Sequence, residues 1–337
     1  MVSFGNLAPD LSLIRDYTRK DSHASVPARV THFQNRGKNL YYVQAQHEVG
    51  IDNPTCETIK KSFDKYSPQI AIIEGLDTSE GISPSSYFQY IPKDNNGKFE
   101  NEQVYTAYLA HKKNIPFIGG EPDYGKVIKE IAKKGYSPQD AMAMHLLAMI
   151  PSIRMEAEKN GGGLSEKSFA ENATYFLQNS PAFVEVPQEQ RLSYDGFKAW
   201  YEKHKANNKK VLEIETADLD PYNTPNSSYF QKLFAAITRV REEHLDTTTA
   251  NALNEHDKVL VVYGSGHLIL SHSVFEKMFE GKGKTSQFIP GDTAQAQLDN
   301  FKSKKTTVKT PIDYIDRSPQ ALIARGRGNT TTISLNK

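Results

Sequence analysis

Short apolar runs alternate with segments of helical periodicity through the first part of the chain, and one more apolar run follows near its end. The runs are bounded by Gly, Pro or polar residues, which is typical of strands buried on both faces. They lie at residues 40–43, 70–73, 116–118 and 258–263. Residues 54–66 and 102–113, which follow the first two runs, place apolar side chains at helical spacing. This alternation predicts βαβ units, and therefore an α/β domain with a largely parallel sheet.

The pattern becomes mostly helical between about residues 138 and 207. We expect this stretch to be a helical cap inserted in the α/β core, followed by a long helix over about 228–253. Residues 1–37 are polar and aperiodic, which predicts an N-terminal arm on the surface. Residues 291–337 are polar and basic and are expected to form a C-terminal tail. The catalytic domain would then span residues 38–290.

The charge balance and the cysteine content exclude several classes of function and site. The chain has 41 Lys and Arg against 40 Asp and Glu, a formal net charge of +1. Such a balanced chain has no overall field that would attract nucleic acid. The single cysteine, Cys56, excludes an intramolecular disulfide and a multi-cysteine zinc site. Neither a signal peptide nor an apolar run of membrane-spanning length is visible, so we expect a cytoplasmic protein with no membrane span, although export without a cleaved signal stays open.

Ionisable side chains follow each of the predicted strands. His47 comes after the first run, Glu74 directly after the second, Glu121 after the third and His267 after the last. The carboxyl ends of parallel strands meet at one edge of a sheet, where ligands bind. The sequence therefore predicts that two imidazoles and two carboxylates come together at this edge.

Such a set of side chains can perform hydrolysis in two ways. Neutral imidazoles and carboxylates are ligands for a divalent cation, which activates a bound water. Without a metal, a carboxylate can hold a histidine in one tautomer so that it acts as general base toward water. The sequence leaves both routes open.

The turn before His267 reads Gly264-Ser265-Gly266. We expect its glycines to allow a sharp turn that presents His267 at the start of a helix, where the helix dipole favours the neutral imidazole. The turn lacks the GxGxxG spacing and the P-loop lysine, and it is not a GxSxG elbow. Near His47, Ile51 stands where a zincin helix needs its second histidine, so that motif is absent too.

Two segments together resemble the Tiki/TraB family, which is related to the erythromycin esterases and the haem-binding ChaN proteins. The first is the strand and turn to His47 with the later run Pro68–Glu74. The second is the arginine-containing helix around Arg239 and Arg241 followed by a strand and the Gly264–His267 turn. The resemblance covers about residues 38–125 and 228–282. At the place of the usual first glycine of the family's Gly-x-x-His motif, this chain has Gln44.

The resemblance implies a three-layer α/β/α fold with a sheet split into two halves and an active centre shared between them. It implies a hydrolase, either a metal-dependent protease or an esterase. His47, Glu74, His267 and Arg241 would be catalytic, Arg241 holding a substrate carboxylate or the developing oxyanion. His47, Glu74, Glu121 and His267 would be the ligands of a divalent metal ion of the Mn, Co or Zn class. The substrate would be a peptide or a small ester or amide.

Two alternatives belong to other classes of function. One is a protein of the same fold that binds haem or a similar ligand between two subunits, which would require a homodimer. The other is a signalling or effector protein with a vestigial site, in which the polar loop at 76–99 and the helical insertion would serve as partner surfaces.

Overall fold

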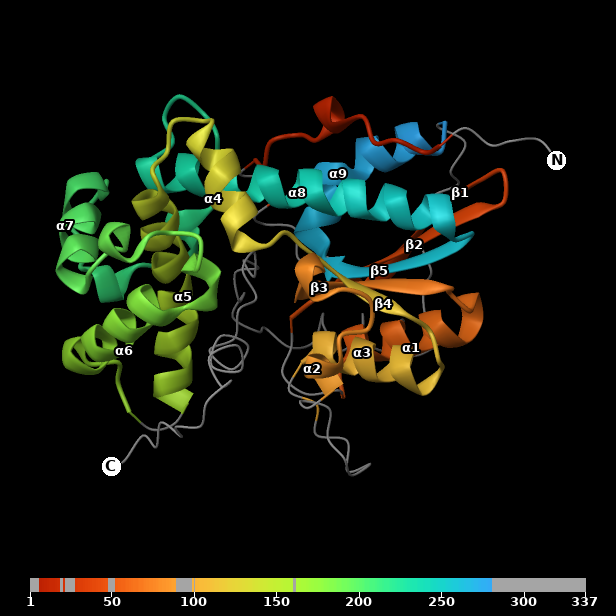
Figure 1. Cartoon of the computed structure of the whole chain (residues 1–337), viewed down its shortest axis with the longest axis horizontal. Helices are drawn as coiled ribbons and strands as arrows, with labels where there is room; N and C mark the ends of the chain where they lie inside the picture. The colour runs from red at the N-terminus through yellow and green to blue at the C-terminus, as the bar shows by residue number, and fades with distance from the viewer. Residues whose placement is uncertain are drawn as a thin grey trace, which may run out of the picture. The chain divides into compact units, whose positions relative to one another are not determined.

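The computed structural model describes residues 6–18, 21, 28–47, 52–88, 99, 101–159 and 162–280. The chain divides into two compact units, and each is described by itself (Figure 1). The first comprises Met1–Pro122 and Arg241–Tyr314; the second comprises Asp123–Val240 and Ile315–Lys337. The C-terminal tail predicted at 291–337 lies outside the described residues.

The first unit contains a five-stranded sheet in the order β1-β2-β5-β3-β4. The strands are β1 (Arg29–Asn35), β2 (Lys38–Ala45), β3 (Ile70–Asp77), β4 (Phe117–Glu121) and β5 (Lys258–Gly264). Only β1 runs antiparallel to its neighbour. It joins β2 through Arg36 and Gly37, whose φ angles of 48° and 87° are those of a tight hairpin turn. The predicted α/β fold with a largely parallel sheet is confirmed.

Strand β5, the last of the described strands in sequence, occupies the centre of the sheet. Val262 pairs with Val43 of β2 on one side and with Ile73 of β3 on the other. The pairs β1-β2 and β3-β4 therefore flank a strand that comes almost 140 residues after β4. All three paired residues are fully or almost fully buried, as the unbroken apolar runs require.

Helices cover both faces of the sheet and make a three-layer α/β/α arrangement (Figure 1). On one face lie α1 (Pro54–Tyr66), α2 (Ser85–Phe88) and α3 (Glu102–Lys112), and α1 and α3 pack directly on β2 and β3. On the other face lie α9 (Ser265–Met278) and the part of α8 (Tyr229–Glu255) that begins at Arg241. Ile59, Phe63 and Val262 belong to the apolar core beneath the first layer.

The second unit is helical. Its helices are α4 (Tyr124–Ala132), α5 (Pro138–Lys159), α6 (Glu166–Asn179), α7 (Tyr194–His204) and the first part of α8. Short 3-10 turns, η3 (Pro181–Phe183), η4 (Gln188–Gln190), η5 (Val211–Glu213) and η6 (Thr216–Leu219), connect them. Met142 and Met144 on α5 are completely buried, as expected for core residues. The unit is wider than the insertion predicted at 138–207, because α4 and the start of α8 belong to it.

The segment predicted as an N-terminal arm contains more structure than its polar sequence indicated. Besides β1 it includes a 3-10 turn, η1 (Leu11–Leu13). The Leu7 N–H donates to Asn254 Oδ1 on α8 (2.7 Å), and the Arg15 N–H donates to the Leu270 carbonyl on α9 (3.1 Å). The described part of this segment is therefore fastened to the helical layer that covers one face of the sheet.

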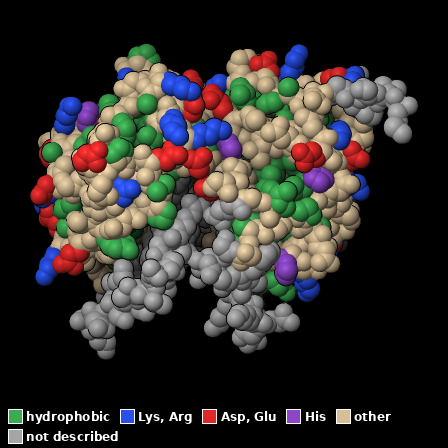
Figure 2. Space-filling view, in the orientation of Figure 1, with side chains coloured by type: hydrophobic (Ala, Val, Ile, Leu, Met, Phe, Trp, Pro, Cys, Tyr) green, Lys and Arg blue, Asp and Glu red, His purple; other side chains and the backbone are tan. Residues whose placement is uncertain are grey.

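Two further features concern the surface. Within the described residues, every helix is too short or too polar to cross a lipid bilayer. On the face shown in Figure 2, the positive and negative side chains are interspersed, as the near-zero net charge suggests.

Candidate functional site

The structure brings all five predicted site residues together within the first unit. His47 lies two residues beyond β2, Glu74 lies inside β3, and Glu121 is the last residue of β4. His267 is the third residue of α9, directly after β5. Arg241 enters from α8. Because β2, β5, β3 and β4 are parallel neighbours, their carboxyl ends deliver these side chains to the same edge of the sheet.

Glu74 is the centre of the cluster and is only 1% exposed. Its Oε2 accepts a hydrogen bond from the Gly264 N–H (2.6 Å) and lies 3.6 Å from His47 Nε2. Its Oε1 lies 3.3 Å from His267 Nε2 and 3.6 Å from an Arg241 guanidinium nitrogen. One carboxylate thus contacts both histidines and the arginine.

The Nδ1 atom of each histidine, on the side of the ring away from Glu74, bonds to another buried glutamate. His47 Nδ1–H donates to Glu102, the first residue of α3. His267 Nδ1–H donates to Glu242 on α8, which also accepts a hydrogen bond from Ser271 Oγ at 3.2 Å. Both arrangements fix the ring tautomer and turn Nε2 toward Glu74.

Neither Glu102 nor Glu242 was predicted as a site residue. Glu102 is acidic in the first turn of a helix, where a carboxylate is common for reasons unrelated to function. Glu242 stands between Arg241 and Glu243 in a polar stretch of α8. Their only unusual property is burial, at 2% and 0% exposure, and burial of these positions depends on the packing of distant elements.

Arg241 is bound by Glu121 rather than free to hold a ligand. Its Nε donates to Glu121 Oε2 (2.7 Å) and its terminal nitrogen donates to Oε1, so the two groups form a bidentate pair. Although burial lowers the pKa of Arg241, Glu121 raises it further, and the net direction is upward. Since both Glu121 oxygens are engaged, the predicted metal-ligand role of Glu121 does not fit this geometry.

The electrostatics keep the central carboxylate charged. Burial raises the pKa of Glu74, but His47, His267 and Arg241 lower it by more, so the net shift is downward. For His267, burial lowers the pKa, whereas Glu242 and Glu74 raise it, to about 9. We expected the helix N-terminus to favour neutral His267; two buried carboxylates oppose that effect and prevail.

Gly264, in the turn before His267, is required for a different reason from the one predicted. Gly264 has φ of −52°, which any residue adopts, so conformational freedom is not needed there. Instead, a Cβ on Gly264 would lie 3.3 Å from His47 Nε2 and 3.4 Å from Glu74 Oε2. Glycine at this position leaves room for the two side chains to approach. Similarly, a Cβ on Gly120 would lie 2.4 Å from the ring of buried Tyr263.

His47 is the most exposed side chain of the cluster, although its Nε2 atom is itself buried. Its side chain is 12% exposed, whereas those of Glu74, Glu102 and His267 are each 2% exposed.

Two observations bear on whether the cluster could hold a metal ion. His47 Nε2, His267 Nε2 and Glu74 supply two imidazoles and a carboxylate, which suits a divalent ion, and the glutamates on both Nδ1 atoms are what metal-binding histidines usually have. In the described part of the chain, however, no three His, Cys, Asp or Glu side chains are positioned as a ready metal site. A bound ion would require the three side chains to adjust.

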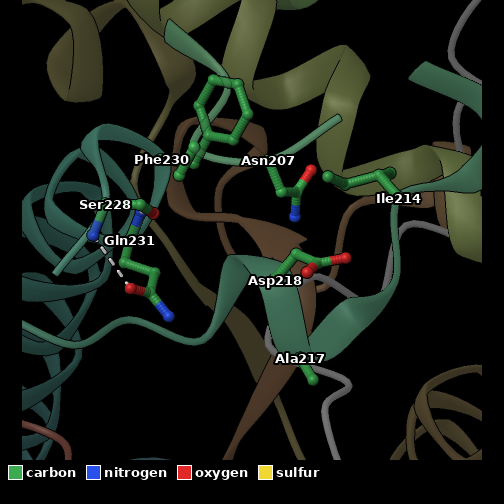
Figure 3. A pocket seen from close by; sticks show the side chains of 8 residues that line it. Asn207, Ile214, Ala217, Asp218, Ser228, Phe230 and Gln231 are labelled. Carbon is green, nitrogen blue, oxygen red and sulfur yellow. Dashed lines mark hydrogen bonds between the residues drawn. The ribbon is translucent and has the colours of Figure 1, made fainter. Parts of the chain in front are cut away.

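The second unit has a cavity of about 170 Å³ (Figure 3), with Asn207, Asp218, Phe230 and Gln231 in its lining. Its polar groups already serve the local structure. Gln231 Oε1 accepts from the Ser228 N–H (3.0 Å), and Asp218 pairs with Lys209 (2.6 Å). No chemistry follows from this cavity.

Comparison with models of known protein families, with curated proteins and with solved structures gave no match for this chain. The function therefore has to be argued from the site itself.

Proposed function

We propose that this protein is a hydrolase that cleaves an ester, amide or peptide bond with a water activated at His47. The observation that carries the proposal is the pair of histidine–glutamate dyads, His47–Glu102 and His267–Glu242, whose Nε2 atoms both face Glu74. A carboxylate behind an imidazole fixes its tautomer and raises its basicity, which is the arrangement that general-base catalysis requires.

The roles follow from position and exposure. His47 is the more exposed of the two histidines, and with its Nδ1–H donated to Glu102 its Nε2 would be the atom that accepts a proton from water. The water oxygen would form a bond to the carbonyl carbon while its proton moves to Nε2. That proton would then pass to the leaving nitrogen or oxygen as the scissile bond breaks. His267 and Arg241 would hold Glu74 ionised and in place opposite His47.

A divalent metal ion remains part of the proposal. Four carboxylates, Glu74, Glu102, Glu121 and Glu242, surround a single guanidinium and two imidazoles. Two protons on the imidazoles or one divalent ion would bring the same positive charge to the cluster. His47, Glu74 and His267 would hold the ion, which would lower the pKa of a bound water.

The test is turnover of p-nitrophenyl esters and of peptide p-nitroanilides by the purified protein, with His47→Ala and Glu102→Gln variants. We expect His47→Ala to lose about 10²–10⁴-fold in kcat/KM, the range of general-base catalysis, with partial rescue by added imidazole. Glu102→Gln should lose less. Full activity in His47→Ala would disprove the role of His47.

Metal content is measured on the same preparations. A stoichiometric divalent ion that disappears in His47→Ala, with activity restored by Mn²⁺, Co²⁺ or Zn²⁺ after chelation, would support the metal-dependent form. Unchanged activity in the presence of a chelator and no bound ion would support activation by the histidine alone.

Haem binding is less well supported. The His267 side chain is only 2% exposed and its Nε2 faces Glu74, so of the two histidines only His47 could serve as an axial ligand. A Soret shift on haem addition, lost in His47→Ala, would reverse this preference.

A further inference from the structure

Arg29, the first residue of β1, is a partly buried arginine with no partner among the described residues. Its Nε atom is buried and makes no hydrogen bond. Burial lowers the pKa of Arg29, and no carboxylate of the described residues raises it. Each of the other described arginines has a partner: Arg15, Arg36, Arg154, Arg191, Arg239 and Arg241. A guanidinium that is partly removed from water is costly unless an anion pairs with it.

Strand pairing places Arg29 at the same edge of the sheet as the cluster. Arg29 pairs with Gln44 of β2, three residues before His47, because β1 runs antiparallel to β2 and begins beside its carboxyl end. Gln44 in turn pairs with Tyr263, the last residue but one of β5. Neighbouring strands lie about 4.8 Å apart, so the Cα atoms of Arg29 and Tyr263 are separated by roughly 10 Å. Arg29 is therefore two strands away from the turn that leads to His267.

Packing against α9 identifies the face of the sheet on which Arg29 lies. The ring of Phe33, further along β1, packs on Phe275 and Phe279 of α9, at 5.6 and 6.1 Å between ring centroids. Alternate residues of a strand share a face, so Arg29 lies on the face that α9 covers (Figure 1). From Phe33 back to Arg29 the strand spans about 13 Å, and about nine residues of a helix span the same length. Gly266 stands at that distance before Phe275, so Arg29 lies at the level of the first turn of α9.

The first turn of α9 adds positive character at this level. Its N-cap residue, Gly264, has no side chain to cap the helix, and a helix N-terminus carries a partial positive charge. The Gly264 N–H binds Glu74, whereas Ser265 and Gly266 are partly exposed. Helices α1, α3, α4, α6 and α7 have a capping side chain: Asn53, Asn101, Asp123, Ser165 and Ser193. A guanidinium together with an uncapped helix N-terminus favours an anion.

We propose that Arg29 binds a carboxylate of the substrate, so that esters or amides with a negative charge several atoms from the scissile bond are preferred. The inference rests on the proposed hydrolase function, since it names the substrate class of the same site. The planar guanidinium matches a carboxylate through two parallel hydrogen bonds. The sequence suggested this task for Arg241, which Glu121 occupies. Among the described arginines at the site edge, Arg29 is the one available for it.

The carboxylates of the cluster do not prevent an anion from binding near them. Glu102 and Glu242 are each paired with an imidazole, and Glu121 is paired with Arg241. The negative charge that a substrate carboxylate would meet is therefore largely balanced, and Arg29 adds a further positive charge beside it.

The test compares substrates that differ in charge. The p-nitrophenyl esters of adipate and suberate end in a carboxylate, and those of hexanoate and octanoate end in a methyl group. A further pair, the hexanoate esters of 4-hydroxybenzoate and 4-hydroxybenzamide, has the charge on the leaving group instead. For the full-length protein we expect kcat/KM of the charged member of at least one pair to exceed that of its neutral partner by about tenfold. The difference should lie mainly in KM, because the carboxylate is bound alike before and during the reaction. Equal kcat/KM values within every pair would overturn the inference.

Variants of Arg29 test the origin of the preference. Arg29→Gln should lower the ratio of charged to neutral substrate about tenfold, to near unity. Arg29→Lys keeps the charge without the planar fork, and we expect it to retain an intermediate ratio. The matched control is Arg36→Gln at the other end of β1, where Arg36 pairs with Glu280, and it should leave the ratio unaltered. An unchanged ratio in Arg29→Gln would contradict the proposal.

A binding measurement separates this inference from the proposed function. The side-chain Nε–H resonance of Arg29, identified by its loss in Arg29→Lys, is followed by NMR during titration with adipamate, with neutral adipamide and with inorganic phosphate. A shift with adipamate and none with adipamide, without turnover of any ester, would keep the carboxylate site and reject the hydrolase. No shift with adipamate, or a shift with phosphate alone, would overturn the inference even if hydrolysis is observed.

Discussion

Two buried carboxylates, Asp140 in the second unit and Glu74 in the first, are stabilised by different kinds of partner. Asp140 of the second unit, 9% exposed, accepts hydrogen bonds from Trp200 Nε1 (2.7 Å) and from Ser137 N–H and O–H (2.7 and 2.8 Å). All of these donors are neutral. Glu74 of the first unit is surrounded instead by His47, His267 and Arg241, with a single backbone N–H.

The difference separates a structural carboxylate from one suited to chemistry. Burial raises the pKa of both groups and their partners lower it by more, so both end below their usual values. The donors around Asp140 do not change charge near neutral pH, and the pair they form with it is permanent. Two partners of Glu74 are imidazoles, whose protons can be exchanged with a substrate or replaced by a metal ion. This contrast predicts different responses to mutation and to pH.

The largest effect should come from removing the permanent cation of the site. Arg241→Met leaves Glu121 and Glu74 buried without their positive partner, and we expect a loss of about 3–5 kcal/mol in the free energy of unfolding. Urea unfolding measures it. Adding Glu121→Leu removes the stranded charge and should restore a large part of the loss. If the double variant is no more stable than Arg241→Met, the pair is not the source of the destabilisation.

The corresponding change at Asp140 removes a neutral donor and should cost less. Trp200→Phe keeps the stacking on Phe230 (5.2 Å between ring centroids) but deletes the N–H that binds Asp140. We expect a loss of about 2–3 kcal/mol, the value of a hydrogen bond to a charged acceptor together with a small cavity. Hydrolysis should be unaffected per folded molecule. A loss below about 0.5 kcal/mol would mean that Ser137 and Tyr229 satisfy Asp140 without Trp200.

The same residues show which parts of the site can be predicted from the sequence. His47, Glu74 and His267 were predictable, because apolar runs locate parallel strands and the ends of such strands converge. Glu102 and Glu242 were not, because a glutamate in a helix looks the same in sequence whether it faces solvent or a buried imidazole. The pairing of Arg241 with Glu121, 120 residues apart, depends on how α8 packs on the sheet.

The turn glycines show the same limit. Gly264 is recognisable from sequence as part of a turn, yet its φ angle needs no glycine. The reason for glycine is the closeness of two side chains from other strands, which no local pattern records. Strand β1 was missed because its polar edge sequence, with the exposed Gln34, lacks a continuous apolar run.

A pH titration distinguishes the imidazole partners of Glu74 from the neutral partners of Asp140. The pKa of His267 is raised from its ordinary value to about 9. Its stabilisation is therefore complete below the unfolded pKa, near 6.5, and is lost as pH rises through 9. Between pH 7 and 10 the wild type should lose on the order of 2 kcal/mol that a His267→Gln variant does not lose. Equal pH slopes in the two proteins would refute the raised pKa, and NMR of the ring measures it directly.

The smallest expected effect comes from one methyl group at Gly264. Gly264→Ala needs no backbone change, but its Cβ would press on His47 Nε2 and Glu74 Oε2 at 3.3 and 3.4 Å. Because a few tenths of an ångström of movement relieve the contact, stability should fall by only about 1 kcal/mol. Turnover should fall further, about tenfold, since the spacing between base and carboxylate is altered.

The matched change is Gly135→Ala in the second unit, where nothing lies within 4 Å of an added Cβ but φ is +89°. There stability alone should suffer, by about 1 kcal/mol. If Gly264→Ala keeps full activity, the contact between His47 and Glu74 is not part of catalysis, and the site would resemble the permanent pairing of Asp140 more than our proposal allows.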